Sequence, residues 1–195
     1  KWGVVLLFRT LAFLFFLTMV STSLNASTAI NGIGLHAVTY NPDKNEFMAA
    51  FVNASSSVST GISTRILTKS GSISGSDLSV HTSGNIDTYG HLSLAYNAAN
   101  KKYIVAFIDQ AKIYTRFVAS DNTSTSNLEE VYGTTSALRA RVAFNSFNNT
   151  YLVCWNQSAT GIKCRMYNAN GTAQATSFTS IAGSSVQNFA IAANI

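Results

Sequence analysis

Residues 142–173, VAFNSFNNTYLVCWNQSATGIKCRMYNANGTA, decide the fold. Short apolar or alternating runs are separated by Asn, Gly and Ser, a pattern typical of β-strands joined by turns. The runs are 142–144, 151–155 and 162–167, and 177–181 follows as a fourth. The stretch therefore predicts a unit of four antiparallel strands.

The same pattern occurs twice earlier in the chain, as AVTYNPDKNEFMAAFVN from Ala37 and SLAYNAANKKYIVAFID from Ser93. Each copy has an aromatic–Asn pair, two later aromatics and an Ile-x-x-Arg step. A five-residue, Asn-rich connection (42–46, 98–102 and 146–150) predicts the first hairpin turn of each copy. Because the landmarks recur about every 50 residues, they predict a repeat architecture. The landmarks are Tyr40, Asn41, Phe47, Phe51, Ile62 and Arg65; Tyr96, Asn97, Tyr103, Phe107, Ile113 and Arg116; and Phe144, Asn145, Tyr151, Trp155, Ile162 and Arg165.

Four strands in about 45–50 residues are typical of one β-propeller blade. We therefore predict an all-β β-propeller with blades at about 35–90, 91–139 and 140–188, and the start of a fourth at 189–195. The first strand of each blade is expected innermost, because small residues precede its aromatic. A β-trefoil is the alternative, but a closed threefold fold should not begin a fourth copy at Ala193-Asn194. On this interpretation the chain is the N-terminal part of a longer protein.

The repeats resemble those of exported bacterial propeller-like proteins, which read roughly Val-Ala-Tyr-Asn, Tyr-Leu-Val-Val-Trp, Ile-Tyr-x-Arg and a Gly turn. The resemblance covers about residues 35–195 and is strongest in the third unit. It implies the fold and export, and it attaches no single activity to the chain. Phe51 and Phe107 stand where the family has Trp, and the acidic residue expected after it survives only as Asp109.

Residues 1–26 have the pattern of a secretory signal peptide, with cleavage expected between residues 23 and 29. Lys1 and Arg9 precede the apolar run 11–20, and small residues follow it. A membrane-spanning helix needs about 20 apolar residues, a length reached here only by counting back to Val4 and burying Arg9. An uncleaved N-terminal anchor is the alternative. We expect a secreted, periplasmic or cell-surface protein.

Charge is scarce in this sequence, with 13 Lys and Arg against 8 Asp and Glu. Part of the net charge of +5 belongs to the predicted signal segment. No basic cluster with interleaved aromatics is present, so we expect neither nucleic acid nor a membrane surface as a partner. The expected partner is an extracellular glycan or protein.

The two cysteines, Cys154 and Cys164, fall on the predicted second and third strands of the third unit. Hairpin pairing about residue 159 sets them opposite each other, and an oxidising compartment favours a disulfide there. Two buried thiols are the alternative.

Few residues point to chemistry. The three histidines lie far apart without ligand partners, so we predict surface or loop histidines, no metal site and no cofactor. The sequence has no calcium-loop motif, carboxylate pair or nucleophile elbow from which to nominate a catalytic residue. The repeated arginines are expected to tie strands or blades together through carbonyls and aromatic faces. These residues are His36, His81 and His91, and Arg65, Arg116 and Arg165.

Three polar residues are the candidate ligand-binding positions: Asn53, Asp109 and Gln157. Each lies two residues after the second aromatic of its unit, so the repeat should place them in a ring at one end of the blades. We interpret the protein as an exported recognition module that binds carbohydrate or protein there. One alternative is a secreted polysaccharide hydrolase or lyase with catalytic residues in further blades, and another is a structural or adhesive surface repeat.

Overall fold

A computed structural model describes residues 36–55, 58–83, 86, 92–132, 136–157, 161–174, 179–182 and 189–192. The predicted signal segment 1–26, its cleavage region, His91 and residues 193–195 lie outside this part. All named elements of the described chain are β-strands. Among the described residues, no helix has the length and apolar character to cross a membrane.

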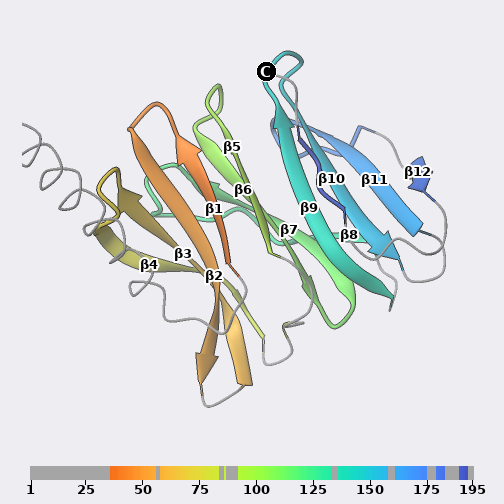
Figure 1. The fold of residues 1–195 in the computed structure, drawn as a ribbon, viewed down its shortest axis with the longest axis horizontal. Coiled ribbons are helices and arrows are strands. Elements are labelled where there is room, and N and C mark those ends of the chain that lie inside the picture. The colour runs from red at the N-terminus through yellow and green to blue at the C-terminus, as the bar shows by residue number, and fades with distance from the viewer. Residues whose placement is uncertain are drawn as a thin grey trace, which may run out of the picture.

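The strands form three separate four-stranded sheets, each antiparallel and each built from consecutive strands (Figure 1). The all-β prediction is confirmed. The third sheet begins at Ala137, which lies within the predicted second unit 91–139. The first sheet contains β1 (His36–Asn41), β2 (Glu46–Ser55), β3 (Val58–Thr68) and β4 (Ile73–Thr82). The second contains β5 (Ser93–Asn97), β6 (Lys102–Asp109), β7 (Lys112–Ala119) and β8 (Glu129–Tyr132). The third contains β9 (Ala137–Asn145), β10 (Thr150–Gln157), β11 (Gly161–Asn168) and β12 (Thr179–Ala182).

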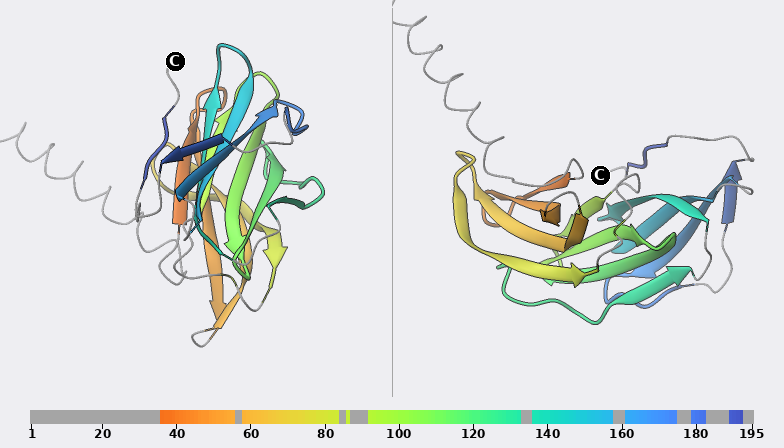
Figure 2. Two further views of the ribbon diagram at one scale, coloured as in Figure 1. Left: turned by 90° about the vertical axis from the view of Figure 1, so that its right-hand side faces the viewer. Right: turned by 90° about the horizontal axis from the view of Figure 1, so that it is seen from below.

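The three sheets lie side by side in chain order, with β1 next to β5 and β5 next to β9 (Figure 2). The described strands do not close into a ring. They also do not form the single closed barrel that a β-trefoil requires, because each unit keeps its own sheet.

The sheets have two distinct ends (Figure 1). At the turn end lie the β1–β2, β5–β6 and β9–β10 turns. Each of these turns begins with the repeated Asn, whose Oδ1 accepts a backbone N–H two residues later at 2.9–3.0 Å. Each turn ends on a positive-φ residue: Asn45, Lys101 and Asn149. The predicted five-residue turns are one residue too long, because Glu46, Lys102 and Thr150 already pair as strand residues.

The loop end carries the β2–β3, β6–β7 and β10–β11 connections. The first of these is a long hairpin that projects beyond its neighbours (Figure 1). The sequence shows extra residues here, and the structure pairs them as strand out to Ser55 and Val58. The variable connection is therefore an extended hairpin with a bulge at Asn53 and Ala54 rather than a longer loop.

Each sheet has a front face towards the preceding sheet and a back face towards the following one. At the first interface, the aliphatic back face of the first sheet packs against the aromatic front face of the second. At the second interface, the back face of the second sheet packs against the front face of the third. The first interface includes Met48, Ala50, Val52, Ile62, Tyr96, Tyr103 and Phe107; the second includes Ile104, Ala106, Ile113, Tyr151, Val153 and Trp155.

The repeated arginines connect successive sheets. Arg116 donates to the carbonyl of Val80 in β4, and Arg165 donates to the carbonyl of Val131 in β8 at 3.3 Å. Both carbonyls belong to the last strand of the preceding sheet. The predicted structural role is confirmed for these two residues.

Arg65 occupies the equivalent position on the front face of the first sheet. Its Nη2 donates to Asp77 Oδ2 at 2.6 Å, and its guanidinium lies 5.2 Å from the ring centre of Phe51. The first sheet therefore uses an acidic side chain of its own β4 where the other two sheets use a carbonyl of their neighbour.

Of the predicted start of a fourth copy at 189–195, the structure describes residues 189–192, which form no strand. Phe189 and Ile191 pack on the back face of the third sheet, against Ile162 and the two cysteines. Leu92 and Leu94, which are likewise two positions apart, pack against the first sheet. The segment thus makes the contacts of a first strand without the strand pairing.

Candidate functional site

The three candidate residues occupy equivalent places at the loop end of their sheets. The cross-strand partners of Asn53, Asp109 and Gln157 are Gly61, Lys112 and Gly161. Each side chain is hydrogen-bonded to a serine, so the described contacts join each of the three to its own surroundings and not to one another. The serines are Ser63, Ser83 and Ser136.

Asn53 and Gln157 contact segments close to them in the fold. Asn53 Nδ2 donates to Ser63 Oγ at 2.7 Å within its own hairpin. Gln157 Nε2 donates to Ser136 Oγ at 3.3 Å, where the chain enters β9. The Gln157 Oε1 is buried and has no hydrogen-bond partner in the described part of the chain. Both residues hold the loop end together.

Asp109 joins the first and second sheets through its two carboxylate oxygens. The Oδ2 lies 2.9 Å from His81 Nε2, and the Oδ1 accepts the Ser83 hydroxyl at 2.9 Å. His81 lies on β4 and Ser83 follows that strand, whereas Asp109 ends β6. Asp109 is 7% exposed, which is low for an acidic residue without such partners. Its carboxylate can still accept further hydrogen bonds, because two oxygens offer about four lone pairs.

Aromatic rings flank the His81–Asp109 pair. The imidazole ring centre lies 5.0 Å from that of Phe107 and 6.0 Å from that of Tyr114. Tyr114 is half-buried, and its hydroxyl lies 3.4 Å from Glu130 Oε2. Burial and the neighbouring Glu130 carboxylate raise the pKa of Tyr114, so its hydroxyl stays protonated as a donor.

Lys112 completes the polar rim of this site. Its ammonium lies 3.2 Å from Glu130 Oε2, and the two side chains are comparably exposed. Together with Tyr114 they border the Asp109–His81 pair on β7 and β8. We call His81, Asp109, Lys112, Tyr114 and Glu130 the Asp109 cluster.

The hydrogen-bond pattern does not fit a serine nucleophile. In a Ser-His-Asp triad the histidine bonds both the serine and the carboxylate. Here the Ser83 hydroxyl donates to Asp109, which is also the partner of His81. The arrangement positions an imidazole and a carboxylate beside an aromatic ring, which suits binding of hydroxyl groups.

Two histidines, His36 and His81, lie among the described residues. His36 is exposed on β1, and His81 is a largely buried strand residue rather than the surface or loop histidine that we predicted. Among the described residues, no group of three or more His, Cys, Asp or Glu side chains is arranged to hold a metal ion.

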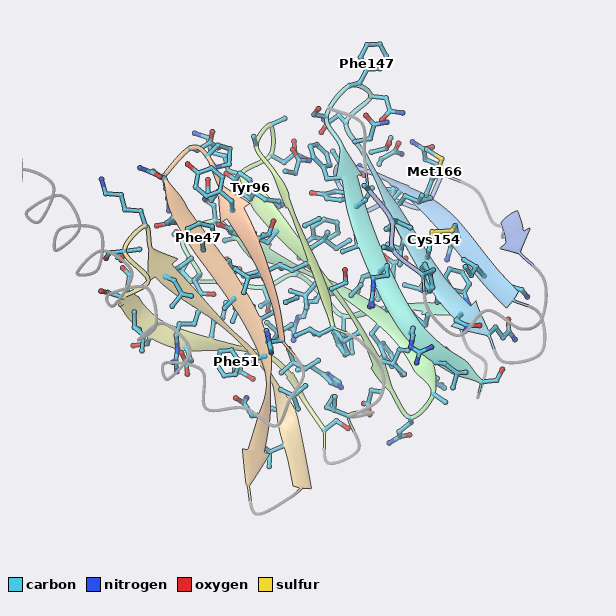
Figure 3. All side chains as sticks on the ribbon, viewed as in Figure 1. Phe47, Phe51, Tyr96, Phe147, Cys154 and Met166 are labelled. Atoms are coloured by element: carbon cyan, nitrogen blue, oxygen red, sulfur yellow. A yellow bond between two sulfur atoms is a disulfide. The ribbon has the colours of Figure 1, made fainter. Side chains whose placement is uncertain are left out.

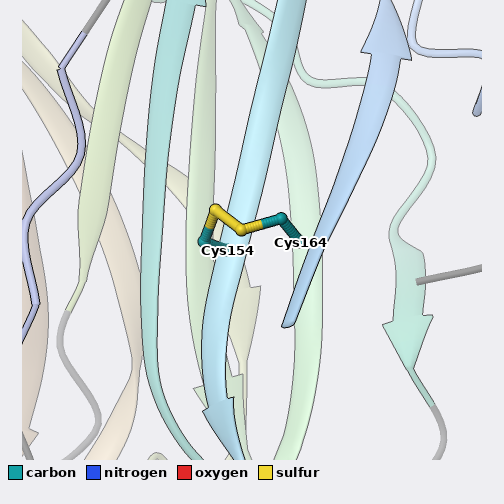
Figure 4. The surroundings of a disulfide bond; sticks show 2 residues. All are labelled: Cys154 and Cys164. Atoms are coloured by element: carbon teal, nitrogen blue, oxygen red, sulfur yellow. A yellow bond between two sulfur atoms is a disulfide. The ribbon is translucent and has the colours of Figure 1, made fainter. Parts of the chain in front are cut away.

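A disulfide joins Cys154 and Cys164 across the β10–β11 hairpin (Figure 4). The two residues are direct cross-strand partners, with Cα atoms 4.0 Å apart. The bond lies on the back face of the third sheet, under Phe189 and Ile191. It therefore stiffens the face opposite Trp155 and lies away from the Asp109 cluster.

Comparisons with known proteins give no family. No protein-family model matches the sequence, and no curated protein is significantly similar to it. Similar solved structures include an N-acetylgalactosamine deacetylase from F. plautii in complex with blood group B trisaccharide, at 10% identity and a TM-score of 0.49 over 71% of this chain and 50% of that one. The Dos1 propeller is similar at 7% identity and a TM-score of 0.47, over 76% and 35% of the two chains.

A third similar structure is the β-propeller domain of Cps50 (Swd1) from Myceliophteria thermophila, at 7% identity and a TM-score of 0.36 over 80% and 58% of the two chains. The chain thus spans less than two thirds of each of these three proteins.

The sequence pointed to Asp109 and missed its partners. His81 lies in a strand whose pairing with β3 shifts register between Ile62 and Ser63 and again between Thr64 and Ile66. Because the repeat spacing cannot anticipate those shifts, it gives no signal that His81 faces Asp109. The second sheet has Tyr114 where the first has Ser63. This exchange is the sequence feature that could have indicated a site beside Asp109.

Proposed function

We propose that this chain is part of an exported β-propeller recognition module that binds carbohydrate at its loop end and performs no catalysis of its own. In this proposal the three sheets are blades, and the Asp109 cluster is the binding site between the first two.

The Asp109 cluster is the observation that carries the proposal. Sugar rings present hydroxyl groups at their edges and C–H groups on their faces, so a site for them combines hydrogen-bonding side chains with an aromatic surface. Asp109 and Glu130 supply acceptors, Lys112 supplies donors, His81 holds the Asp109 carboxylate in place, and Tyr114 supplies a half-buried ring. The opposite charges of the cluster favour a neutral ligand over an anion.

The blade assignment is supported by the repeated interface between sheets. Both interfaces pack an aliphatic back face on an aromatic front face and join them by an arginine-to-carbonyl hydrogen bond. Blades that follow one another around a propeller repeat one interface in this way.

Export is supported by the predicted signal segment 1–26 and by the Cys154–Cys164 disulfide. Structural disulfides persist mainly in oxidising compartments. A secreted, periplasmic or cell-surface location is therefore part of the proposal.

The test is a glycan array probed with the full chain and two variants. Asp109→Asn should weaken binding of the recognised glycan by about 10–100-fold, because a charge-assisted acceptor is lost. Tyr114→Ala should weaken it by a similar factor, because the aromatic surface is removed. Asp121→Asn is the matched control, since Asp121 lies in a turn at the opposite end.

Three results would contradict the proposal: no glycan bound, glycan binding unchanged in both variants, or release of reducing ends from a bound polysaccharide. Thermal unfolding of each variant checks that lost binding does not come from lost folding.

A further inference from the structure

A pocket lies at the turn end, between the second and third sheets. It has a volume of about 250 Å³, and its lining includes Thr115, Phe117, Asn127, Glu129 and Gly171. This is smaller than the roughly 300–1,000 Å³ of a typical drug-sized ligand site, so it suits one chemical group of a larger ligand. The pocket is separate from the Asp109 cluster, which lies at the loop end.

The corresponding place at the first interface is filled by a side chain, that of Asn122. The Asn122 Oδ1 accepts the Thr64 hydroxyl at 2.6 Å. Its Nδ2 donates to the Thr64 carbonyl at 3.2 Å and to the Ser76 carbonyl at 3.1 Å. These three groups therefore form a binding site for a carboxamide, with one donor for the C=O and two acceptors for the N–H groups.

The repeat places the same backbone and hydroxyl groups at the second interface. Thr115 precedes Arg116 as Thr64 precedes Arg65, and Gly171 follows Arg165 by the six residues that separate Asn122 from Arg116. Asn127 corresponds to Ser76, because it lies two residues before Glu129, the cross-strand partner of Thr115. Ser76 likewise lies two residues before Leu78, the partner of Thr64.

The second interface thus has the donor and acceptors of the first and a glycine in place of the asparagine. Thr115 is 2% exposed and lines the pocket. In the described part of the chain no hydrogen bond involves its hydroxyl. The hydroxyl can therefore donate a hydrogen bond to an acceptor on a ligand in the pocket.

Phe117 decides what kind of group the pocket accepts. A Cβ atom built on Gly171 would lie 2.6 Å from a ring carbon of Phe117, so the chain cannot place its own asparagine there without moving the ring. Ile66 is the equivalent residue at the first interface. The ring adds an apolar surface beside the carboxamide-binding groups, and a methyl group fits such a surface.

We propose that this pocket binds the acetamido group of an N-acetylated sugar. The Thr115 hydroxyl donates to the acetamido oxygen, the acetamido N–H donates to a backbone carbonyl of Thr115 or Asn127, and the methyl group packs on Phe117. Glu129 and Asn127 face the same pocket and accept hydrogen bonds from neighbouring ring hydroxyls. This site goes beyond the proposed function and does not depend on the Asp109 cluster.

The experiment titrates the full chain with N-acetylglucosamine, glucose, acetamide and glutamine, and follows the amide resonances of Thr115, Asn127 and Gly171. N-acetylglucosamine should give saturable shifts with a dissociation constant of about 1 mM, a value typical of a single small group. Glucose and acetamide should bind at least about tenfold more weakly, because each lacks half of the ligand.

Three threonine variants separate the hydroxyl from general stability. Thr115→Val should weaken N-acetylglucosamine binding by at least about tenfold, and Thr115→Ser should retain it. Thr64→Val is the matched control, because it removes the same group from the interface that Asn122 already fills. It should leave N-acetylglucosamine binding unchanged.

Several outcomes overturn the proposal. The first is no saturable shift with N-acetylglucosamine, and the second is equal binding of glucose or acetamide. The third is tighter binding of glutamine, which would indicate that the pocket binds a protein side chain. The fourth is an equal loss of N-acetylglucosamine binding in Thr115→Val and Thr64→Val. An Asp109→Asn variant that keeps these shifts while losing array binding would separate the two sites. Loss of the shifts alone would overturn only this inference.

Discussion

The two interfaces between sheets share one framework and differ in what fills it. Both bury aromatics of the following sheet against aliphatic residues of the preceding one, and both use an arginine-to-carbonyl hydrogen bond. At the first interface Asn122 inserts its carboxamide, and Asp109 reaches back to His81. At the second, Gly171 and Phe117 help to line a pocket at the turn end. Packing is thus repeated, whereas the polar residues at the two ends of each interface vary and give each interface its own chemistry.

The largest expected loss of stability comes from removing Trp155, the largest fully buried side chain at the second interface. Trp155→Ala should lower the free energy of unfolding by about 3–5 kcal/mol, because the fully buried indole leaves a cavity. Chemical denaturation measures the change. Phe147→Ala is the control, since Phe147 is 95% exposed at the tip of the β9–β10 turn (Figure 3) and should change stability by less than about 0.5 kcal/mol. Equal effects would mean that Trp155 does not pack between sheets.

The disulfide distinguishes the third sheet from the second, which has Ala106 and Thr115 at the equivalent positions. The double variant Cys154→Ala, Cys164→Thr restores that pair and should cost about 2–3 kcal/mol, because a loop with a sequence separation of 10 is no longer closed in the unfolded chain. Denaturation with and without reductant measures it. The native chain should lose stability on reduction and the double variant should not; a native chain indifferent to reductant would argue against the bond.

The repeated arginines give a smaller and more graded effect. Arg116→Met and Arg165→Met should each cost about 1–2 kcal/mol, because each removes a hydrogen bond from a charged donor to the preceding sheet. Arg65→Met should cost less than about 1 kcal/mol, since its ion pair with Asp77 is partly exposed. A uniform loss in all three variants would show that the carbonyl contact between sheets adds nothing over the local ion pair.

The sequence predicts the parts of the fold in which strand pairing is regular and fails where the pairing shifts register. The β1–β2, β5–β6 and β9–β10 hairpins are paired regularly next to their turns, and Cys154 and Cys164 lie in a regularly paired hairpin. Because the turn of a regular hairpin fixes its register, each cross-strand partner can be counted from the turn. The last strand of each sheet is different. Its pairing shifts register in all three sheets, so the partners of β4, β8 and β12 residues cannot be counted from the repeat.

That irregularity explains which parts of the two sites were missed. Asp109 was found from its place in the repeat, whereas His81 lies on β4 and its contact depends on the shifted pairing. The exchange of Asn122 for Gly171 is visible in the sequence. Its meaning needs the contact of Asn122 with Thr64 and Ser76, which joins residues more than 40 positions apart.

The most direct test of the shared framework is to open the first interface and refill it. Asn122→Gly suits the positive φ of that position and should cost about 1–3 kcal/mol, because three hydrogen bonds are lost. If the Thr64 and Ser76 groups form a carboxamide site, acetamide should raise the unfolding temperature of this variant by several degrees more than it raises that of the native chain. Equal shifts in the two proteins, or a variant as stable as the native chain, would contradict the account.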